Sequence, residues 1–342
     1  MNKVIFVFLT ISISFFYGCG NANKKPNTSV NSEVDSLSVL SELINNDSLN
    51  PQLFTSRARL YYVKGKIDPA LRDLQSALKL NPNSAKSFLL LSDIYFTLGQ
   101  TDNSIAALKK VIKLTPDNEV PFLKLSETYL LLNKPDVAIK YADEALKINR
   151  ENAESYYVKA MALLEIKDTA SAIINFKISA NLDSDNFMTF MQLGAIYTSK
   201  GDTLSKENFE KALLAKPDDE RALYYLAMYY QEQGDYDNAI NRFSRIAELY
   251  PDNKRVFYNM GYIYLVEKED FDNAKIMFQK AIDLSPRYVE AVYNLGRTLE
   301  AMGDYKSARI QYRKALELLP NYPLAVQGMN RLDDIMIRNA PN

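Results

Sequence analysis

The stretch KRVFYNMGYIYLVEKEDFDNAKIMFQKAIDLSPRY (residues 254–288) is followed at once by VEAVYNLGRTLEAMGDYKSARIQYRKALELLPNY (residues 289–322). Both stretches have tyrosine at their fifth position, glycine at their eighth and a proline close to their end. A chain that repeats itself after about 34 residues is built from copies of one small unit, which cannot bury its apolar face alone. The repeat therefore decides the fold.

Prolines mark this period over most of the chain. They stand at Pro82, Pro116, Pro217, Pro251, Pro286 and Pro320. The one long gap is 101 residues, three periods less one residue, and Arg150 and Ser184 occupy the two positions that lack proline. The sequence thus predicts eight blocks: 51–84, 85–118, 119–152, 153–186, 187–219, 220–253, 254–288 and 289–322.

Each block predicts two helices joined by a short turn. The eighth position is always small: Ala58, Ser92, Ser126, Ala160, Gly194, Ala227, Gly261 and Gly296. A second small residue stands near the twentieth position: Ala70, Ser104, Ala138, Ala172, Ser205, Ala239, Ala274 and Ala308. Apolar residues at helical spacing surround both positions, so that paired helices can approach closely. Five blocks have glycine at the turn, where a positive φ is often needed.

The pattern resembles the tetratricopeptide repeat, most closely at residues 234–239, 257–261 and 292–296. The resemblance covers 51–322, about four fifths of the chain. It implies an all-α fold, a right-handed α-solenoid of about eight helix–turn–helix repeats. The blocks depart from the family pattern by a one-residue deletion in 187–219 and a one-residue insertion in 254–288.

Both ends of such an array need a cover, because an exposed terminal repeat leaves an apolar face in water. Residues 33–50 contain apolar residues at helical spacing and are expected to form an N-terminal capping helix. Residues 323–342 are expected to form a C-terminal capping helix and tail.

The N-terminus has the features of an export signal. Residues 4–17 are uncharged and follow Lys3, and this apolar run is shorter than the roughly 20 residues that cross a bilayer. The Gly18-Cys19 junction that follows resembles a bacterial lipoprotein signal, which implies that 1–18 is removed and Cys19 carries lipid. Cleavage after Ala22 and an uncleaved anchor are the alternatives. Residues 19–32 are polar and are expected to form a flexible tether.

Composition argues against catalysis. The chain has no histidine and a single cysteine, and its formal net charge is -1. Histidine-activated nucleophiles and the usual zinc sites are therefore excluded, and no basic surplus draws the chain to nucleic acid. We predict no enzyme activity, no catalytic residue, no cofactor, no metal site and no nucleic-acid partner.

The resemblance also implies a binding site. In the tetratricopeptide family the first helix of each repeat lines a concave groove, and fifth-position side chains point into it. The residues predicted to contact a partner are Tyr157, Tyr224, Tyr258, Tyr293, Asn259, Asn294, Arg221, Arg255 and Arg297. Tyrosine and arginine dominate binding hot spots. A purely structural role is the alternative, because tyrosine followed by asparagine is common at these positions in the family at large.

Together these features predict a non-catalytic scaffold or adaptor for protein–protein interaction in the bacterial cell envelope. It would hold a peptide or helix segment of other envelope proteins in its groove and reach the membrane through its lipid anchor. Gly20 stands where many inner-membrane lipoproteins have aspartate, which favours the outer membrane, facing the periplasm. The alternative is a protein that binds glycan or peptidoglycan fragments, with the tyrosines stacking on sugars.

Overall fold

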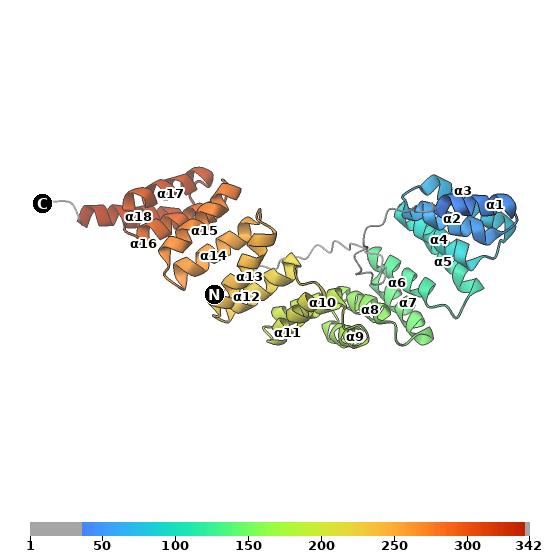
Figure 1. Cartoon of the computed structure of the whole chain (residues 1–342). Helices are drawn as coiled ribbons and strands as arrows, with labels where there is room; N and C mark the ends of the chain where they lie inside the picture. The colour runs from blue at the N-terminus through green and yellow to red at the C-terminus, as the bar shows by residue number, and fades with distance from the viewer. Residues whose placement is uncertain (1–35, 339–342) are drawn as a thin grey trace, which may run out of the picture. The chain divides into compact units, whose positions relative to one another are not determined.

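The computed structural model describes residues 36–338. The predicted all-α repeat fold is confirmed, since these residues form eighteen α-helices and no strand. The predicted signal peptide (1–18), Cys19, the tether (19–32) and residues 33–35 lie outside the described residues. The chain divides into two compact units, one ending at Asn81 and one beginning at Pro82 (Figure 1).

The first unit is a three-helix group. It contains α1 (Ser36–Asn46), α2 (Pro51–Val63) and α3 (Ile67–Leu80). Helices α2 and α3 pack around Ala58 and Ala70, which are fully buried. The Arg57 guanidinium donates two hydrogen bonds of 2.8 Å to the Asp73 carboxylate and one of 3.0 Å to Ser41 Oγ. These bonds join all three helices.

The second unit continues the helical pairs along the chain (Figure 1). Its helices are α4 (Ala85–Thr97), α5 (Thr101–Leu114), α6 (Val120–Leu131), α7 (Pro135–Ile148), α8 (Ala153–Glu165), α9 (Thr169–Leu182), α10 (Phe187–Ser199), α11 (Leu204–Ala215), α12 (Glu220–Glu232), α13 (Tyr236–Leu249), α14 (Lys254–Val266), α15 (Phe271–Leu284), α16 (Val289–Ala301), α17 (Tyr305–Leu318) and α18 (Pro323–Arg338). Every predicted block that lies in this unit holds one pair, from α4–α5 to α16–α17.

Side-chain caps set where many of these helices begin. Asn152 and Asn253 accept hydrogen bonds from backbone N–H groups at the starts of α8 and α14. Asp235 and Asp304 do the same for the second helices α13 and α17. Such a cap satisfies a backbone donor that the helix itself leaves without a partner.

The turns within the pairs confirm the expected need for a positive φ. Five blocks use glycine there: Gly65, Gly99, Gly201, Gly234 and Gly303, with φ between 65° and 79°. Asn133, Lys167 and Glu269 adopt the same conformation in three other blocks, at φ of 54°, 64° and 49°. The left-handed turn is therefore a property of the repeat and does not depend on glycine alone.

The small eighth residues allow an aromatic ring of the second helix to lie against the first. An added Cβ on Gly194 would lie 2.5 Å from the Phe209 ring, and one on Gly261 would lie 2.9 Å from Phe278. Both rings are fully buried. Even an alanine at these two positions would force the neighbouring ring to shift.

The last helix packs on the end of the array. Its residues Ala325 and Leu332 are buried, and Gly328 lies against the ring of Tyr312 in α17. Arg331 donates two hydrogen bonds of 2.9 Å to the Glu300 carboxylate in α16, and Arg309 forms an ion pair with Asp333. Helix α18 thus has both an apolar contact and charged contacts with the last pair.

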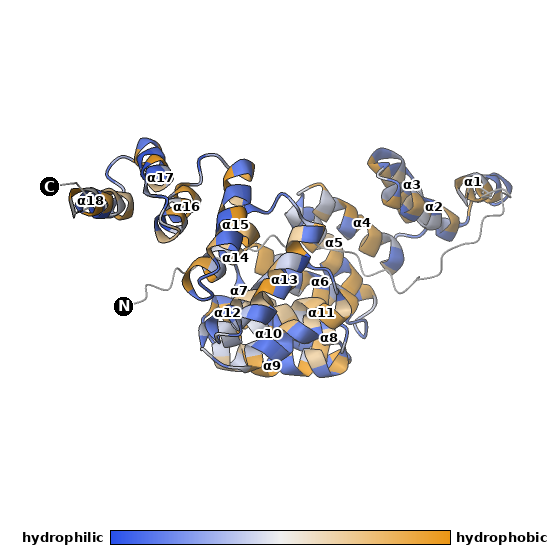
Figure 2. Cartoon of the chain, turned by 60° about the vertical axis from the view of Figure 1, so that its left-hand side comes forward, coloured by the Kyte–Doolittle hydropathy of each residue, from blue (hydrophilic) through white to orange (hydrophobic). Residues whose placement is uncertain are grey.

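No helix within 36–338 has the length and apolar character of a membrane span. Figure 2 shows polar and apolar residues interspersed along the helices, as expected where one side packs and the other meets water.

Candidate functional site

The fifth-position tyrosines occupy equivalent places on four first helices. The ring of Tyr224 in α12 lies 5.7 Å from that of Phe243, and the ring of Tyr258 in α14 lies 5.8 Å from that of Phe278. The same contact joins Tyr157 to Phe176 and Tyr293 to Tyr312, at 5.7 Å in each case. Each tyrosine ring therefore packs against an aromatic ring of the second helix of the same pair.

A ladder of hydrogen bonds joins these tyrosines to the sixth-position amide of the following block. Asn259 Nδ2 donates to Tyr224 Oη, and Asn294 Nδ2 donates to Tyr258 Oη, both at 3.1 Å. A side-chain hydrogen bond also joins Tyr157 to Gln192. We call the surface made by Tyr224, Tyr258, Tyr293, Asn259 and Asn294 on α12, α14 and α16 the tyrosine face.

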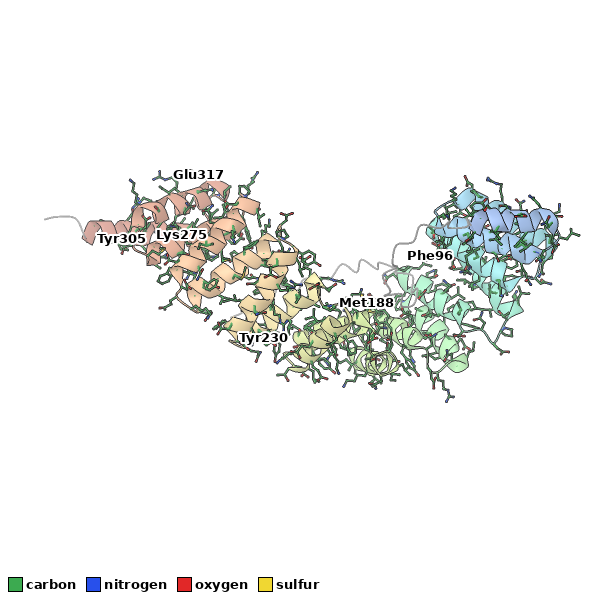
Figure 3. All side chains as sticks on the ribbon, viewed as in Figure 1. Phe96, Met188, Tyr230, Lys275, Tyr305 and Glu317 are labelled. Carbon is green, nitrogen blue, oxygen red and sulfur yellow. The ribbon has the colours of Figure 1, made fainter. Side chains whose placement is uncertain are left out.

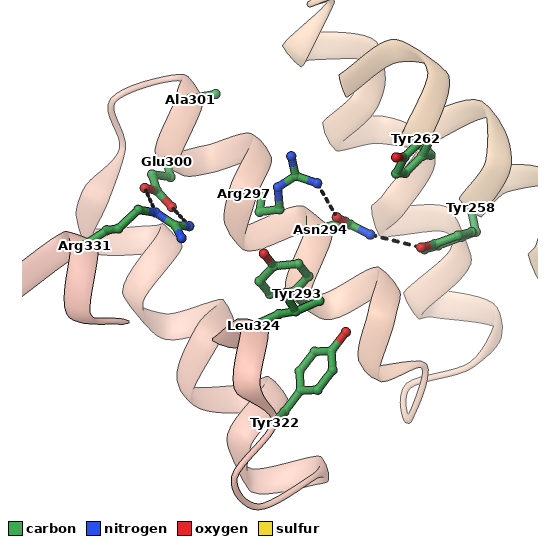
Figure 4. A pocket seen from close by; sticks show the side chains of 10 residues that line it. All are labelled: Tyr258, Tyr262, Tyr293, Asn294, Arg297, Glu300, Ala301, Tyr322, Leu324 and Arg331. Carbon is green, nitrogen blue, oxygen red and sulfur yellow. Dashed lines mark hydrogen bonds and ion pairs between the residues drawn. The ribbon is translucent and has the colours of Figure 1, made fainter. Parts of the chain in front are cut away.

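An open hollow of about 700 Å³ lies at the end of the tyrosine face (Figure 4). Its lining comes from α14, α16, the residues before α18 and α18 itself: Tyr258, Tyr262, Tyr293, Asn294, Arg297, Glu300, Ala301, Tyr322, Leu324 and Arg331. Arg297 Nη1 donates to Asn294 Oδ1 at 3.2 Å, so the arginine and the ladder are connected. Four tyrosines thus share the hollow with Arg297 and with the Arg331–Glu300 ion pair.

The hydroxyls of Tyr258 and Tyr288 stay protonated at neutral pH. Burial, together with the nearby Glu290 carboxylate, raises the pKa of Tyr258 to about 12. Burial also raises the pKa of Tyr288, and the neighbouring Tyr258 adds to this, again to about 12. Protonated hydroxyls can donate hydrogen bonds to a bound molecule.

The predicted arginines differ in how far they are already engaged. Arg255 is exposed on α14. Arg221 lies 3.8 Å from Asp219 and 5.7 Å from the centre of the Phe187 ring. Burial raises the pKa of Tyr157 to about 12, and the charge of Arg221 opposes this shift. Arg221 and Tyr157 are thus near each other, while Tyr258, Tyr293, Asn294 and Arg297 share the hollow.

One expectation about the fifth position needs correction. Tyr157, Tyr224 and Tyr258 are half-buried, but Tyr293 is 7% exposed and Asn294 is 4% exposed. The ring of Tyr293 packs on Tyr312 and on Tyr322, at 5.7 Å and 5.6 Å. Tyr293 therefore does not point away from the core, although it lines the hollow.

The sequence prediction missed three tyrosines near the tyrosine face: Tyr262, Tyr288 and Tyr322. Tyr288 lies 5.1 Å from Tyr258, ring to ring, as Tyr322 lies against Tyr293. Both are the last residues of their blocks, two positions after the closing proline. This shared position was a signal for a second row of tyrosines beside the first.

A half-buried glutamate, Glu127, lies on the first helix of an earlier block. Glu127 in α6 is half-buried, and burial raises its pKa to about 7, with Lys124 opposing the shift and Glu154 and Asp93 adding to it. Lys124 Nζ itself lies 2.8 Å from Asp93 Oδ1. Glu127 is therefore left without a full countercharge.

No group of three or more acidic, cysteine or histidine side chains in the described part of the chain could hold a metal ion.

We expect Glu127→Gln to stabilise the chain at alkaline pH. A carboxyl whose folded pKa lies above its unfolded value costs stability as the pH rises from about 4.5 to about 7, and the cost then stays constant. The variant should gain about 1–2 kcal/mol at pH 8 and nothing at pH 4.5. Thermal melts at the two pH values measure this, with the exposed Glu165→Gln as control. An equal effect at both pH values would contradict the assignment.

Comparison with known proteins gives consistent results. Family models described as tetratricopeptide repeat match residues 55–119 and 123–184, 218–287, and 265–332. Among curated proteins none matches the chain.

Solved structures with this fold include the C-terminal part of a TPR repeat-containing protein from Cytophaga hutchinsonii. It is 18% identical, with a TM-score of 0.61 over 70% of this chain and 98% of that one. Pseudomonas aeruginosa PilF is 16% identical, with a TM-score of 0.54 over 60% of this chain and 94% of that one. MamA is 30% identical over 46% of this chain and 92% of its own, with a TM-score of 0.42. The matched repeat models span most of 55–332, and the chain belongs to the tetratricopeptide repeat family.

Proposed function

We propose that this chain is a non-catalytic adaptor that holds a segment of another protein against its tyrosine face. The observation that carries the proposal is the hollow beside that face, where four tyrosines, an asparagine and Arg297 meet. Tyrosine and arginine in a partly desolvated pocket are typical of binding hot spots. The family's general use as a protein-interaction scaffold agrees with this function.

The ring packing argues against the glycan alternative. A sugar that stacks on tyrosine needs one open face of the ring. Tyr293 is 7% exposed and packs on Tyr312 and Tyr322, while Tyr258 packs on Phe278 and Tyr288. These rings already pack against other aromatic rings, whereas the Tyr258 hydroxyl accepts from Asn294 and still has its own proton to donate, which suits a polypeptide better than a stacked sugar.

Truncation of Tyr258 tests the function. Tyr258→Ala should lower the capture of proteins by in-cell crosslinking about thirtyfold, because a hot-spot tyrosine contributes about 2 kcal/mol or more. The helical circular dichroism signal should remain, since Tyr258 is only half-buried. Tyr305→Ala is the matched control, because Tyr305 is exposed at the start of α17 and does not line the hollow (Figure 3). Unchanged capture by a folded Tyr258→Ala protein would refute the assignment.

We further propose that the adaptor works in the cell envelope, attached by lipid on Cys19 to the outer membrane and facing the periplasm. The Gly18-Cys19 junction after an apolar run supports the anchor, and Gly20 supports the outer membrane. The polar residues 19–32 would let the folded part stand roughly 20 Å from the membrane surface.

Replacement of the cysteine tests the anchor. Cys19→Ala should move the protein from the membrane fraction to the soluble periplasmic fraction or block its processing, because a thiol is needed for lipid attachment. Fractionation and intact mass measure the outcome, with Ser32→Ala as a control outside the junction. An unmodified mature chain that begins at Asn23 would show that ordinary cleavage after Ala22 takes place instead.

A further inference from the structure

We propose that the partner segment, if it binds as described above, is an extended chain in polyproline II conformation. Its main-chain carbonyl oxygens would accept hydrogen bonds from the hydroxyls of Tyr224 and Tyr258. In this arrangement Asn259 and Asn294 hold the tyrosines in position by hydrogen bonds and do not touch the partner. The inference rests on the proposed function and goes beyond it, because it names the groups that bind and the conformation they select.

The direction of the ladder bonds follows from Arg297. A guanidinium can only donate, so the Asn294 atom that lies 3.2 Å from Arg297 Nη1 must be the oxygen Oδ1. Asn294 Nδ2 therefore faces Tyr258 and donates to its Oη. In the preceding rung Asn259 Nδ2 faces two acceptors, Tyr224 Oη at 3.1 Å and Met228 Sδ at 3.8 Å. Both tyrosine oxygens thus act as acceptors toward the protein.

A hydroxyl that accepts a hydrogen bond still has its own proton to donate. Elsewhere in the chain this proton is used: Tyr236 donates to Glu267 at 2.8 Å, and Tyr312 donates to Glu300. Within residues 36–338, the hydroxyls of Tyr224 and Tyr258 have no such acceptor. Each rung of the tyrosine face therefore presents one fixed donor, and a ligand must supply the acceptors.

The ladder ends at the hollow. The residue that would follow the pattern after Tyr293 is Gly328 in α18, which has no amide side chain and packs on Tyr312. The Tyr293 hydroxyl consequently has no rung partner, and it lies in the hollow beside Arg297 (Figure 4). The donors of the tyrosine face thus continue to Arg297, a further hydrogen-bond donor in the same hollow, which suits an acceptor-rich chain.

The spacing of the donors selects the conformation of that chain. Helices α14 and α16 are in contact, the Asn259–Tyr224 hydrogen bond joins α12 to α14, and packed helices are about 8–10 Å apart. A polyproline II helix advances about 9 Å per turn of three residues, so every third carbonyl points the same way at this interval. A β-strand has a period of two residues, so that carbonyls three residues apart point in opposite directions and only every other one would face the tyrosine hydroxyls. An α-helical segment has already used its carbonyls internally.

The paired rings provide the second feature that a polyproline II chain requires. Tyr258 with Tyr288 forms a tilted pair and Tyr293 with Tyr322 an edge-to-face pair, with centroids 5.1 Å and 5.6 Å apart, one block from each other. Aromatic grooves with hydrogen-bond donors beside them are the usual receptors for proline-rich chains. The preformed conformation of such a chain also reduces the entropy lost on binding.

The test uses fluorescein-labelled dodecaproline as the probe and a glycine–serine peptide of equal length as its control. Anisotropy should show saturable binding of dodecaproline and none of the control. Tyr224→Phe and Tyr258→Phe keep the rings and remove the hydroxyls, so each should raise the dissociation constant for dodecaproline about fivefold. Tyr305→Phe should leave it unchanged, because Tyr305 lies outside the hollow.

The role of the asparagines is separable from contact. Asn294→Ala should weaken dodecaproline binding about as much as Tyr258→Phe does, and it should add nothing further in the Tyr258→Phe background. Additive losses would show that Asn294 touches the peptide directly and would overturn its positioning role.

Two outcomes distinguish this inference from the function on which it rests. If dodecaproline does not bind at millimolar concentration, or if the phenylalanine variants bind it with unchanged affinity, the inference falls. Should protein capture still depend on Tyr258 in that case, the proposed function stands and the partner uses another conformation. If capture is also insensitive to Tyr258, both fall.

Discussion

A chain that stops after Pro323 should melt at a clearly lower temperature than the full chain and should self-associate. The truncation removes nearly all of α18 and uncovers the ring of Tyr312 and Ala315, both fully buried in the intact protein. Loss of the Leu332 contact alone removes about 1.5–3 kcal/mol of apolar burial. The two hydrogen bonds from Arg331 to Glu300 disappear with it.

The measurement is a thermal melt followed by circular dichroism, with sedimentation to detect association. Because each repeat contacts only its neighbours, the loss should begin at α16 and α17 and leave the earlier pairs helical. A chain that ends after Arg338 retains all of α18 and is the matched control. If the shorter chain is as soluble and as stable as this control, α18 does not cap the array.

Tyr312→Ala should cost about 3–5 kcal/mol, the usual cost of removing a fully buried aromatic ring. The ring lies between two glycines of different helices, because an added Cβ on Gly296 or Gly328 would lie 2.7 Å or 2.6 Å from it. Its hydroxyl donates a hydrogen bond to the Glu300 carboxylate, which also accepts a hydrogen bond from Arg331. The truncation therefore leaves a cavity where α16, α17 and α18 meet.

Chemical denaturation followed by circular dichroism measures this cost. Tyr305→Ala removes the same side chain from an exposed position of the same helix and should change stability by less than about 0.5 kcal/mol. Tyr312→Phe should lie between the two, because it keeps the ring and removes only the hydrogen bonds of the hydroxyl with Glu300 and Arg331. Equal stabilities for the alanine variants at 305 and 312 would contradict the packing described for α17.

The helix pairs, their turns and the close approach at the eighth position were predictable because each depends on residues within one block. Gly296 and Tyr312, for example, lie in the same block and pack within one pair. The repeated pattern supplies eight observations of the same rule, so single departures such as the non-glycine turn at Lys167 do not hide it.

The tyrosine face was predictable only in part. Its residues followed from the resemblance, but the bonds between them did not, because Tyr258 and Asn294 are 36 positions apart and meet only when two blocks pack side by side. The burial of Tyr293 was missed for a related reason. Its ring packs on Tyr322, the last residue of the block, and on Tyr312 of the second helix, where the other blocks have an equivalent ring contact.

The ladder also bears on how such an array can change length during evolution. Each asparagine reaches the tyrosine of the preceding block, so a residue gained or lost inside a first helix would break two rungs at once. From α8 to α16 every first helix has 13 residues. The extra residue of 254–288 lies in the turn between α14 and α15, and the deletion in 187–219 falls after its first helix, where α11 has 12 residues. Insertions and deletions in this chain are therefore found where they leave the spacing of the donors intact.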